Sequence, residues 1–200
     1  SILCDYGVGP FAGEPLGGQT FQNWNNLAAE WSPSTADMTH RFIFNAVYEL
    51  PALGDAPAAV KHLLGGWQLG GIWSAFSGGP LGVVSQVNNT FSQGGGQRPN
   101  WNGVNPIADN PTVDRWLDPT VFSAPAGFAF GNAPRTFNGT RSHGTNQFDM
   151  TLSKNFRFKE HYRIQFRTEV FNVTNSPRFA PPNVNFGNPQ FGVSSAQANQ

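Results

Sequence analysis

Residues 148–158 read F-D-M-T-L-S-K-N-F-R-F, and the order of side chains in this stretch decides the fold. Apolar residues occupy the even positions from Phe148 to Phe158, with Lys154 as the main exception, and polar residues occupy the odd positions. A repeat of two residues places apolar side chains on one face of a β-strand and polar side chains on the other. After 159–161 the alternation returns in Y-R-I-Q-F-R-T-E-V-F-N-V, so we expect a second strand at 162–173.

The three residues 159–161 determine how these two strands pair. A loop of odd length keeps apolar residues opposite apolar ones, whereas a slip of one residue would mix the two faces. We therefore predict an antiparallel hairpin with the pairs Phe158–Tyr162, Arg157–Arg163, Phe156–Ile164, Asn155–Gln165 and Met150–Val170.

Two further strands are expected upstream, and long loops separate them from the hairpin. Residues 41–50 read R-F-I-F-N-A-V-Y-E-L, and residues 67–77 read W-Q-L-G-G-I-W-S-A-F-S. The second strand has an alternative end near residue 87, with Gly78-Gly79-Pro80 as a bend. Short helical turns are expected near 24–31 and 58–64. The Asn-, Gly- and Pro-rich remainder predicts long loops at about 1–36, 88–147 and 175–200.

The composition favours an all-β protein. Glycine and proline number 23 and 16 among 200 residues, aromatic residues reach 14%, and charged residues only 12%. Lysine plus arginine and aspartate plus glutamate number 12 each, so no basic surface points to a nucleic-acid partner. The single cysteine, Cys4, excludes an internal disulfide framework. The chain begins with Ser and shows no signal peptide, so we interpret it as a fragment of a longer protein.

Three features favour antiparallel transmembrane β-barrel strands over the alternative, a secreted or cell-surface β-sandwich used for binding or adhesion. The predicted strands are about ten residues or longer, which suits a tilted membrane strand. The 159–161 connection is tight and the 88–147 connection is very long, as expected of periplasmic turns and extracellular loops. Aromatic residues also gather near strand ends. Lys154 falls on the predicted lipid face, so it must reach the interface or turn inward through a bulge.

Several segments occur in a characteristic order. They are D-M-T-H-R-F (37–42), Y-E-L-P (48–51), G-G-W-Q-L-G-G-I (65–72), F-G-N-A-P-R (130–135), F-D-M-T-L-S-K-N-F-R (148–157) and F-R-T-E-V-F-N-V-T-N-S-P-R-F (166–179). Over roughly residues 35–192 the chain resembles the C-terminal barrel of Oar-like TonB-dependent receptors.

The resemblance implies a large outer-membrane barrel, of the order of 22 strands with a plugged lumen. In that case residues 1–200 form a partial, open section of the wall that contacts outer-membrane lipid. The implied partners are an N-terminal plug domain and the TonB complex, both reached through sequence outside this chain, and an extracellular ligand of unknown identity. The implied function is energised uptake of that ligand.

Enzymatic or metal chemistry is not indicated. His40, His62, His143 and His161 are scattered without a ligand spacing, and the aspartates at 109, 114 and 118 lack the closing glutamate of a calcium loop. Gly94-Gly95-Gly96 precedes no Lys-Ser/Thr pair, so it does not indicate a phosphate-binding loop. We expect no catalytic residue, no metal site and no cofactor.

The polar face of the hairpin carries the candidate site residues Arg157, Arg163, Arg167 and Glu169. In a barrel these side chains face the lumen, where they either contact the plug or are simply solvated. Arg157 and Arg163 stand opposite each other, and like charges in that position are unfavourable without an acidic partner or an anion between them. The loop aromatics, which either pack the loops together or contact ligand, are Trp24, Trp31, Phe91, Trp101, Trp116, Phe122, Phe128, Phe130 and Phe137.

Overall fold

A computed structural model describes residues 22–194, apart from Trp24, 52–56, 58–59, 61–63, 91–96 and 159–161. The chain divides into two compact units. One unit, the sheet unit, consists of residues 40–76 and 145–177. The other, which we call the loop unit, comprises the described residues before 40, the segment 77–144 and the segment from 178 to 194.

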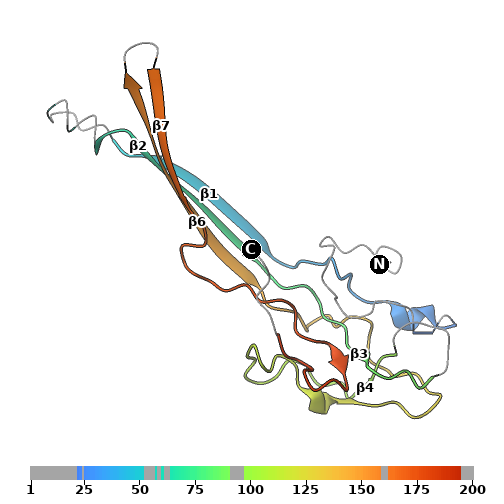
Figure 1. Cartoon of the computed structure of the whole chain (residues 1–200). Helices are drawn as coiled ribbons and strands as arrows, with labels where there is room; N and C mark the ends of the chain where they lie inside the picture. Colours follow the sequence, from blue (N-terminus) through green and yellow to red (C-terminus); the bar gives the residue numbers. More distant parts are fainter. Residues whose placement is uncertain are drawn as a thin grey trace. The chain divides into compact units, whose positions relative to one another are not determined.

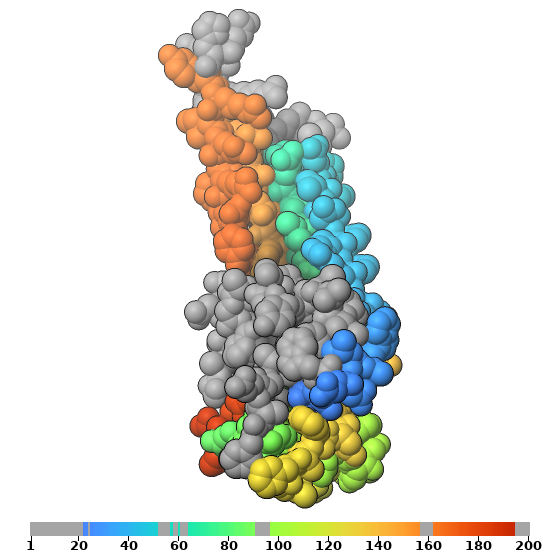
Figure 2. Space-filling model, turned by 90° about the vertical axis from the view of Figure 1, so that its right-hand side faces the viewer, coloured from blue at the N-terminus to red at the C-terminus, as the bar shows by residue number. Residues whose placement is uncertain are grey.

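The sheet unit is a four-stranded antiparallel sheet (Figure 1). Its strand order is β1-β2-β6-β7, so the four strands lie side by side in the order in which they occur in the sequence. The strands are β1 (Arg41–Glu49), β2 (Trp67–Phe76), β6 (Thr145–Phe158) and β7 (Tyr162–Val170). They pack side by side in the space-filling view (Figure 2). Strands β1 and β7 form the two edges of the open sheet.

The predicted register is confirmed pair by pair. Strand β6 meets β7 through Phe158–Tyr162, Arg157–Arg163, Phe156–Ile164, Asn155–Gln165 and Met150–Val170. Arg41 pairs with Phe76, and Phe76 pairs with Thr145, so the chain enters β1, leaves β2 and enters β6 at one end of the sheet. The long 77–144 connection therefore lies at the opposite end from the tight 159–161 connection, as the loop lengths predicted.

Several strand boundaries differ from the sequence prediction, beginning with β1, which ends at Glu49 and not at 50. Strand β6 begins at Thr145 and not at 148, because residues 145–147 continue the pairing with β2. The alternative extension of β2 to residue 87 is wrong. Strand β2 ends at Phe76, and Val84–Ser85 form a separate strand, β3, parallel to β8 (Asn185–Phe186).

Strand β7 ends at Val170 and not at 173, because the chain turns at Asn172. Asn172 and Asn175 adopt left-handed φ angles of 49° and 48°, which asparagine tolerates better than most residues. The Asn172 amide donates to the Asp149 carboxylate at 2.8 Å, and the Asn172 side chain accepts from the Ser176 amide at 3.0 Å. The N-V-T-N-S sequence is therefore a turn that binds back onto β6.

The loop unit has a hydrophobic core of its own. Its buried residues are Leu81, Val83, Leu117, Val121, Phe122, Ala133, Phe137 and Val184. Short elements frame this core: β3, β4 (Asn100–Trp101), β5 (Phe122–Ser123), β8 and the 3₁₀ turns η1 (Leu27–Glu30) and η2 (Pro119–Val121). The 3₁₀ turn η1 confirms a helical turn within 24–31, whereas the turn expected at 58–64 falls largely outside the described residues.

A buried ion pair ties the segment before β1 to the loop unit. Arg98 binds the Glu30 carboxylate through both terminal nitrogens, at 2.7 and 2.8 Å, and both side chains are almost fully buried. Gln22 accepts from the Arg98 amide at 2.6 Å and donates to the Gly131 carbonyl at 2.9 Å. Because a buried charge without its partner is costly, this network makes the segment an integral part of the loop unit.

Gly131 marks the closest backbone approach in this network, since a Cβ there would lie 2.0 Å from the Arg98 carbonyl oxygen. Gly131→Ala should therefore destabilise the loop unit by about 1–3 kcal/mol, the usual cost of overpacking. Limited proteolysis across 77–144 should detect the loosened fold. Gly139→Ala is the matched control, because a Cβ at Gly139 meets nothing within 4 Å. Equal protease resistance of both variants would contradict the predicted packing.

Candidate functional site

One face of the sheet unit is apolar and largely exposed. The register puts Phe44, Trp73, Phe148, Leu152 and Phe166 on this face together with their apolar neighbours. Phe44 is 54% exposed, Trp73 42% and Phe166 47%, so no protein layer covers these rings in the part of the chain that the structure describes. A water-facing surface of this kind is unfavourable, and it indicates an apolar environment beyond the protein.

Lys154 is the charged residue on this apolar face, and the structure shows how it is accommodated. It pairs in register with Trp67 and Phe166, so no bulge turns it to the other face. Its Nζ donates to the Gly65 carbonyl at 2.5 Å and lies 5.3 Å from the Trp67 ring and 5.1 Å from the Phe156 ring. The ammonium is thus covered by protein groups, with the side chain 4% exposed, and it holds the chain just before β2.

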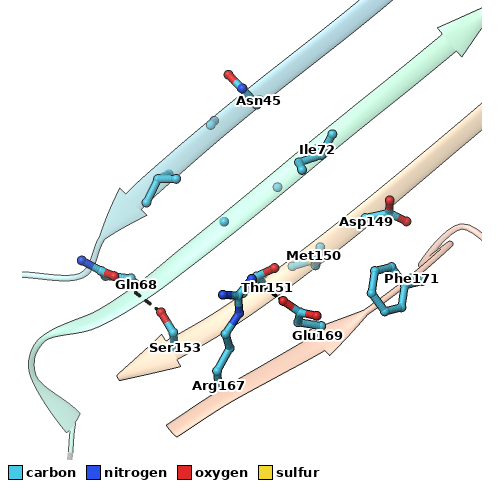
Figure 3. A pocket seen from close by; sticks show the side chains of 14 residues that line it. Asn45, Gln68, Ile72, Asp149, Met150, Thr151, Ser153, Arg167, Glu169 and Phe171 are labelled. Atoms are coloured by element: carbon cyan, nitrogen blue, oxygen red, sulfur yellow. Dashed lines mark hydrogen bonds and ion pairs between the residues drawn. The ribbon is translucent and has the colours of Figure 1, made fainter. Parts of the chain in front are cut away.

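The opposite face is polar and contains a hollow of about 500 Å³ (Figure 3). The hollow spans all four strands, and Gly70 on β2 lies at its floor. Side chains from β1, β2, β6 and β7 surround it, among them Asn45, Gln68, Ile72, Asp149, Thr151 and Glu169. Gly70 is one of the lining residues and contributes no side chain to the hollow.

Polar groups on this face bind one another both within a strand and across strands. Arg167 forms an ion pair with Glu169 on the same strand (Figure 3). Gln68 donates to Glu49 at 2.7 Å and lies 3.5 Å from the Ser153 hydroxyl. Asp149 accepts from the Gln147 side chain at 3.0 Å and from the amide of the turn after β7. The face is therefore hydrogen-bonded and hydrated, in contrast to the apolar face.

Comparison with known families explains the two faces. The family described as "Outer membrane beta barrel domain" matches residues 5–200. The chain belongs to this outer membrane β-barrel family. No curated protein and no solved structure matches it. No helix among the described residues is long and apolar enough to cross a membrane.

Family membership establishes an all-β outer-membrane protein that contacts membrane lipid. The strands of such a barrel place apolar residues toward lipid and polar residues toward the lumen. The alternative of a secreted β-sandwich is thereby overturned, and no second sheet covers the apolar face in the described part of the chain. In this outer-membrane β-barrel protein, the face with Phe44 and Leu152 contacts lipid, and the face with the hollow is luminal.

The predicted site residues have the same parity in the register but do not form one cluster. Arg167 and Glu169 line the hollow and pair with each other. Arg163 stands opposite Arg157, six register pairs from the Thr151–Glu169 pair, and does not line the hollow. The side chain of Arg157 lies outside the described part of the structure.

Sequence reasoning missed Gly70 and Asp149 as parts of the site. The pair Gly70-Gly71 was visible in the sequence, and a glycine inside a strand often marks a close backbone approach or a missing side chain. Asp149 has the luminal parity of Arg167, but only its bond to Asn172 shows that it joins β6 to the turn after β7. Cross-strand register was needed to bring these residues together.

Some of the loop aromatics pack against the core of the loop unit, and others are exposed. Trp101, Trp116, Phe122 and Phe137 pack on or within the core of the loop unit, whereas Trp31 and Phe128 are 74% and 79% exposed. Phe130 is 40% exposed. Trp24 and Phe91 lie outside the described residues. Packing thus accounts for four of the nine aromatics considered as ligand contacts.

His143 has a structural environment in the loop unit. Its ring contacts Trp116 at a centroid distance of 4.0 Å, and its Nε2 lies 2.7 Å from the Ser194 hydroxyl. Burial lowers the pKa of His143, so the ring favours its neutral form. Among the described residues, no group of three or more His, Cys, Asp or Glu side chains is arranged to hold a metal ion.

Adjacent residues of β6 test the assignment of the two faces. Leu152→Arg places a charge on the lipid face and should destabilise the inserted barrel by about 2–4 kcal/mol if it lies near the midplane. Thr151→Arg places the same charge on the luminal face and should be tolerated. Heat-modifiable migration of the full-length protein from outer-membrane fractions measures both. A greater loss of folded protein in Thr151→Arg than in Leu152→Arg would reverse the assignment.

Proposed function

We propose that the chain is part of the wall and outer surface of an Oar-like, TonB-dependent receptor that takes up an extracellular ligand. The ordered segments from 37–42 to 166–179 support this identity, and membership of the outer membrane β-barrel family is consistent with it. The proposed activity is transport, with no catalytic residue and no cofactor contributed by this chain.

The packed loop unit is the observation that carries the proposal. A passive pore needs loops that leave its entrance open, whereas a receptor needs an outer surface of defined shape. Here residues from 77–144 and 178–194 share one hydrophobic core, and the Glu30–Arg98 ion pair adds the segment before β1. These segments connect to the strands at the end of the sheet where β1 begins, β2 ends and β6 begins. The tight 159–161 connection is at the other end, so we expect the first end to be extracellular.

Dependence on TonB is tested genetically. A strain lacking this gene and a strain lacking tonB should show growth defects on the same sole nutrients, and the double mutant should be no worse than the tonB strain. Labelled forms of those nutrients then give the uptake rate directly. A porin mutant serves as the control for passive entry. A growth or uptake defect of the gene deletion that persists unchanged in the tonB background would contradict energised transport.

We also propose that Arg157 and Arg163 contact an acidic part of a plug domain. The two arginines are partners in the register, which supports this proposal, whereas Arg167 is balanced by Glu169. An acidic partner would relieve the repulsion between two like charges. Arg167 and Glu169 are proposed to lie at the border of this contact.

Charge reversal at Arg163 tests the plug contact. Arg163→Glu in the full-length protein should weaken plug docking, because it replaces attraction by repulsion. Increased protease cleavage of the plug and slower uptake are the expected results. Arg41→Glu, on the same face of β1, is the control with an equal change of charge. Unchanged protease resistance and uptake in Arg163→Glu would contradict the contact.

A further inference from the structure

Gly70 lines the hollow on the polar face of the sheet and leaves space where another residue would place a side chain. Gly70 pairs with Val47 on one side and with Thr151 on the other, while Gln68 and Ile72 flank it along β2. A Cβ at Gly70 would meet Thr151 at 3.6 Å, an ordinary van der Waals contact, and the residue has no left-handed φ. Neither local backbone conformation nor crowding therefore requires glycine here, so the space itself is the feature to explain.

The lining of the hollow is amphipathic. Val47, Ile72 and Phe171 supply apolar surface, and they are 73%, 49% and 67% exposed. Asn45 and Thr151 line it too, and neither side chain makes a hydrogen bond to the residues that the structure describes. Exposed apolar groups beside available hydrogen-bonding groups are the usual features of a small-molecule site.

The charges in the hollow select against anions. Glu169 neutralises Arg167, and Asp149 adds a carboxylate that already accepts from Gln147 and from the amide of Asn172. An anion would therefore meet two carboxylates and one guanidinium that is already engaged. An uncharged ligand with many hydroxyl groups avoids that repulsion, since hydroxyls donate to carboxylates and accept from amides.

We propose that the hollow around Gly70 is a binding subsite for a neutral, hydroxyl-rich ligand, that is, a sugar unit, on the luminal wall. The C–H face of a sugar ring would lie on Val47 and Ile72, and its hydroxyls would reach Asn45, Thr151 and Glu169. The volume of about 500 Å³ lies within the range of small-ligand pockets. The inference rests on the proposed transport function, because it names the class of the transported ligand and a site where that ligand binds on its way through the barrel.

Protection of an introduced thiol tests the subsite in the purified full-length protein. Thr151→Cys is made in a Cys4→Ser background, and its labelling rate with a small hydrophilic maleimide is measured. Maltotriose, cellotriose and xylotriose are the probes, with trialanine and glucose 6-phosphate as charged comparators. At least one neutral trisaccharide should slow labelling markedly, whereas the comparators should not.

Second variants separate binding from folding. Gly70→Leu fills the hollow and should abolish protection. Glu169→Gln removes a charged acceptor and should weaken binding by about tenfold or more. Ser74→Val, on the same face of β2 but outside the hollow, should leave protection unchanged. Heat-modifiable migration confirms that each variant is folded.

The outcomes distinguish this inference from the proposed function. No protection by any trisaccharide, or protection by a charged comparator instead, overturns the sugar subsite. Absence of labelling without any added compound shows that protein already fills the hollow, and this also overturns it. Either result leaves the tonB genetics untouched, so the transport proposal stands or falls separately.

Discussion

The apolar face of the sheet unit is the constraint on which the rest of the protein depends. Burial of one large apolar side chain is worth about 1.5–3 kcal/mol, and this face carries many such side chains without a second protein layer in the described residues. Lipid supplies the missing layer. Because lipid offers no hydrogen bonds, every backbone group must pair within the sheet, which explains the long, regular strands. The same constraint explains why Lys154 is enclosed by Trp67, Phe156 and the Gly65 carbonyl.

The loop unit is stabilised differently, because it has a hydrophobic core of its own. Aromatic and aliphatic residues spread over 81–137 and 184–191 meet around Phe122 and Phe137. The buried Glu30–Arg98 pair then ties the chain before β1 to this core. Sequence that resembles a long irregular loop thus folds around a hydrophobic core. The sheet unit and the loop unit are built from alternating segments of one chain.

The polar face of the sheet unit follows from the same alternation as the apolar face. Because side chains alternate along β6, Leu152 faces lipid while Thr151 and Ser153 face the lumen. The same strands therefore form the hydrogen-bonding surface, and no additional strand or helix is needed for it. Gly70 interrupts that surface at its centre, and the turn at Asn172 adds Phe171 at its border. The paired Arg167 and Glu169 balance charge beside the hollow.

The sequence alone determined the strands, their faces and the hairpin register, because a repeat of two residues is a local property and a three-residue loop permits one register without mixing the faces. It also indicated the luminal parity of Arg163, Arg167 and Glu169. Tertiary structure decided the rest. The ends of β6 and β7 depend on partners at Phe76 and Asn172, and the parallel pairing of Val84 with Asn185 joins segments a hundred residues apart. The hollow around Gly70 is likewise lined by residues of four strands. A local sequence pattern does not specify which side chains of separate strands will lie around a glycine.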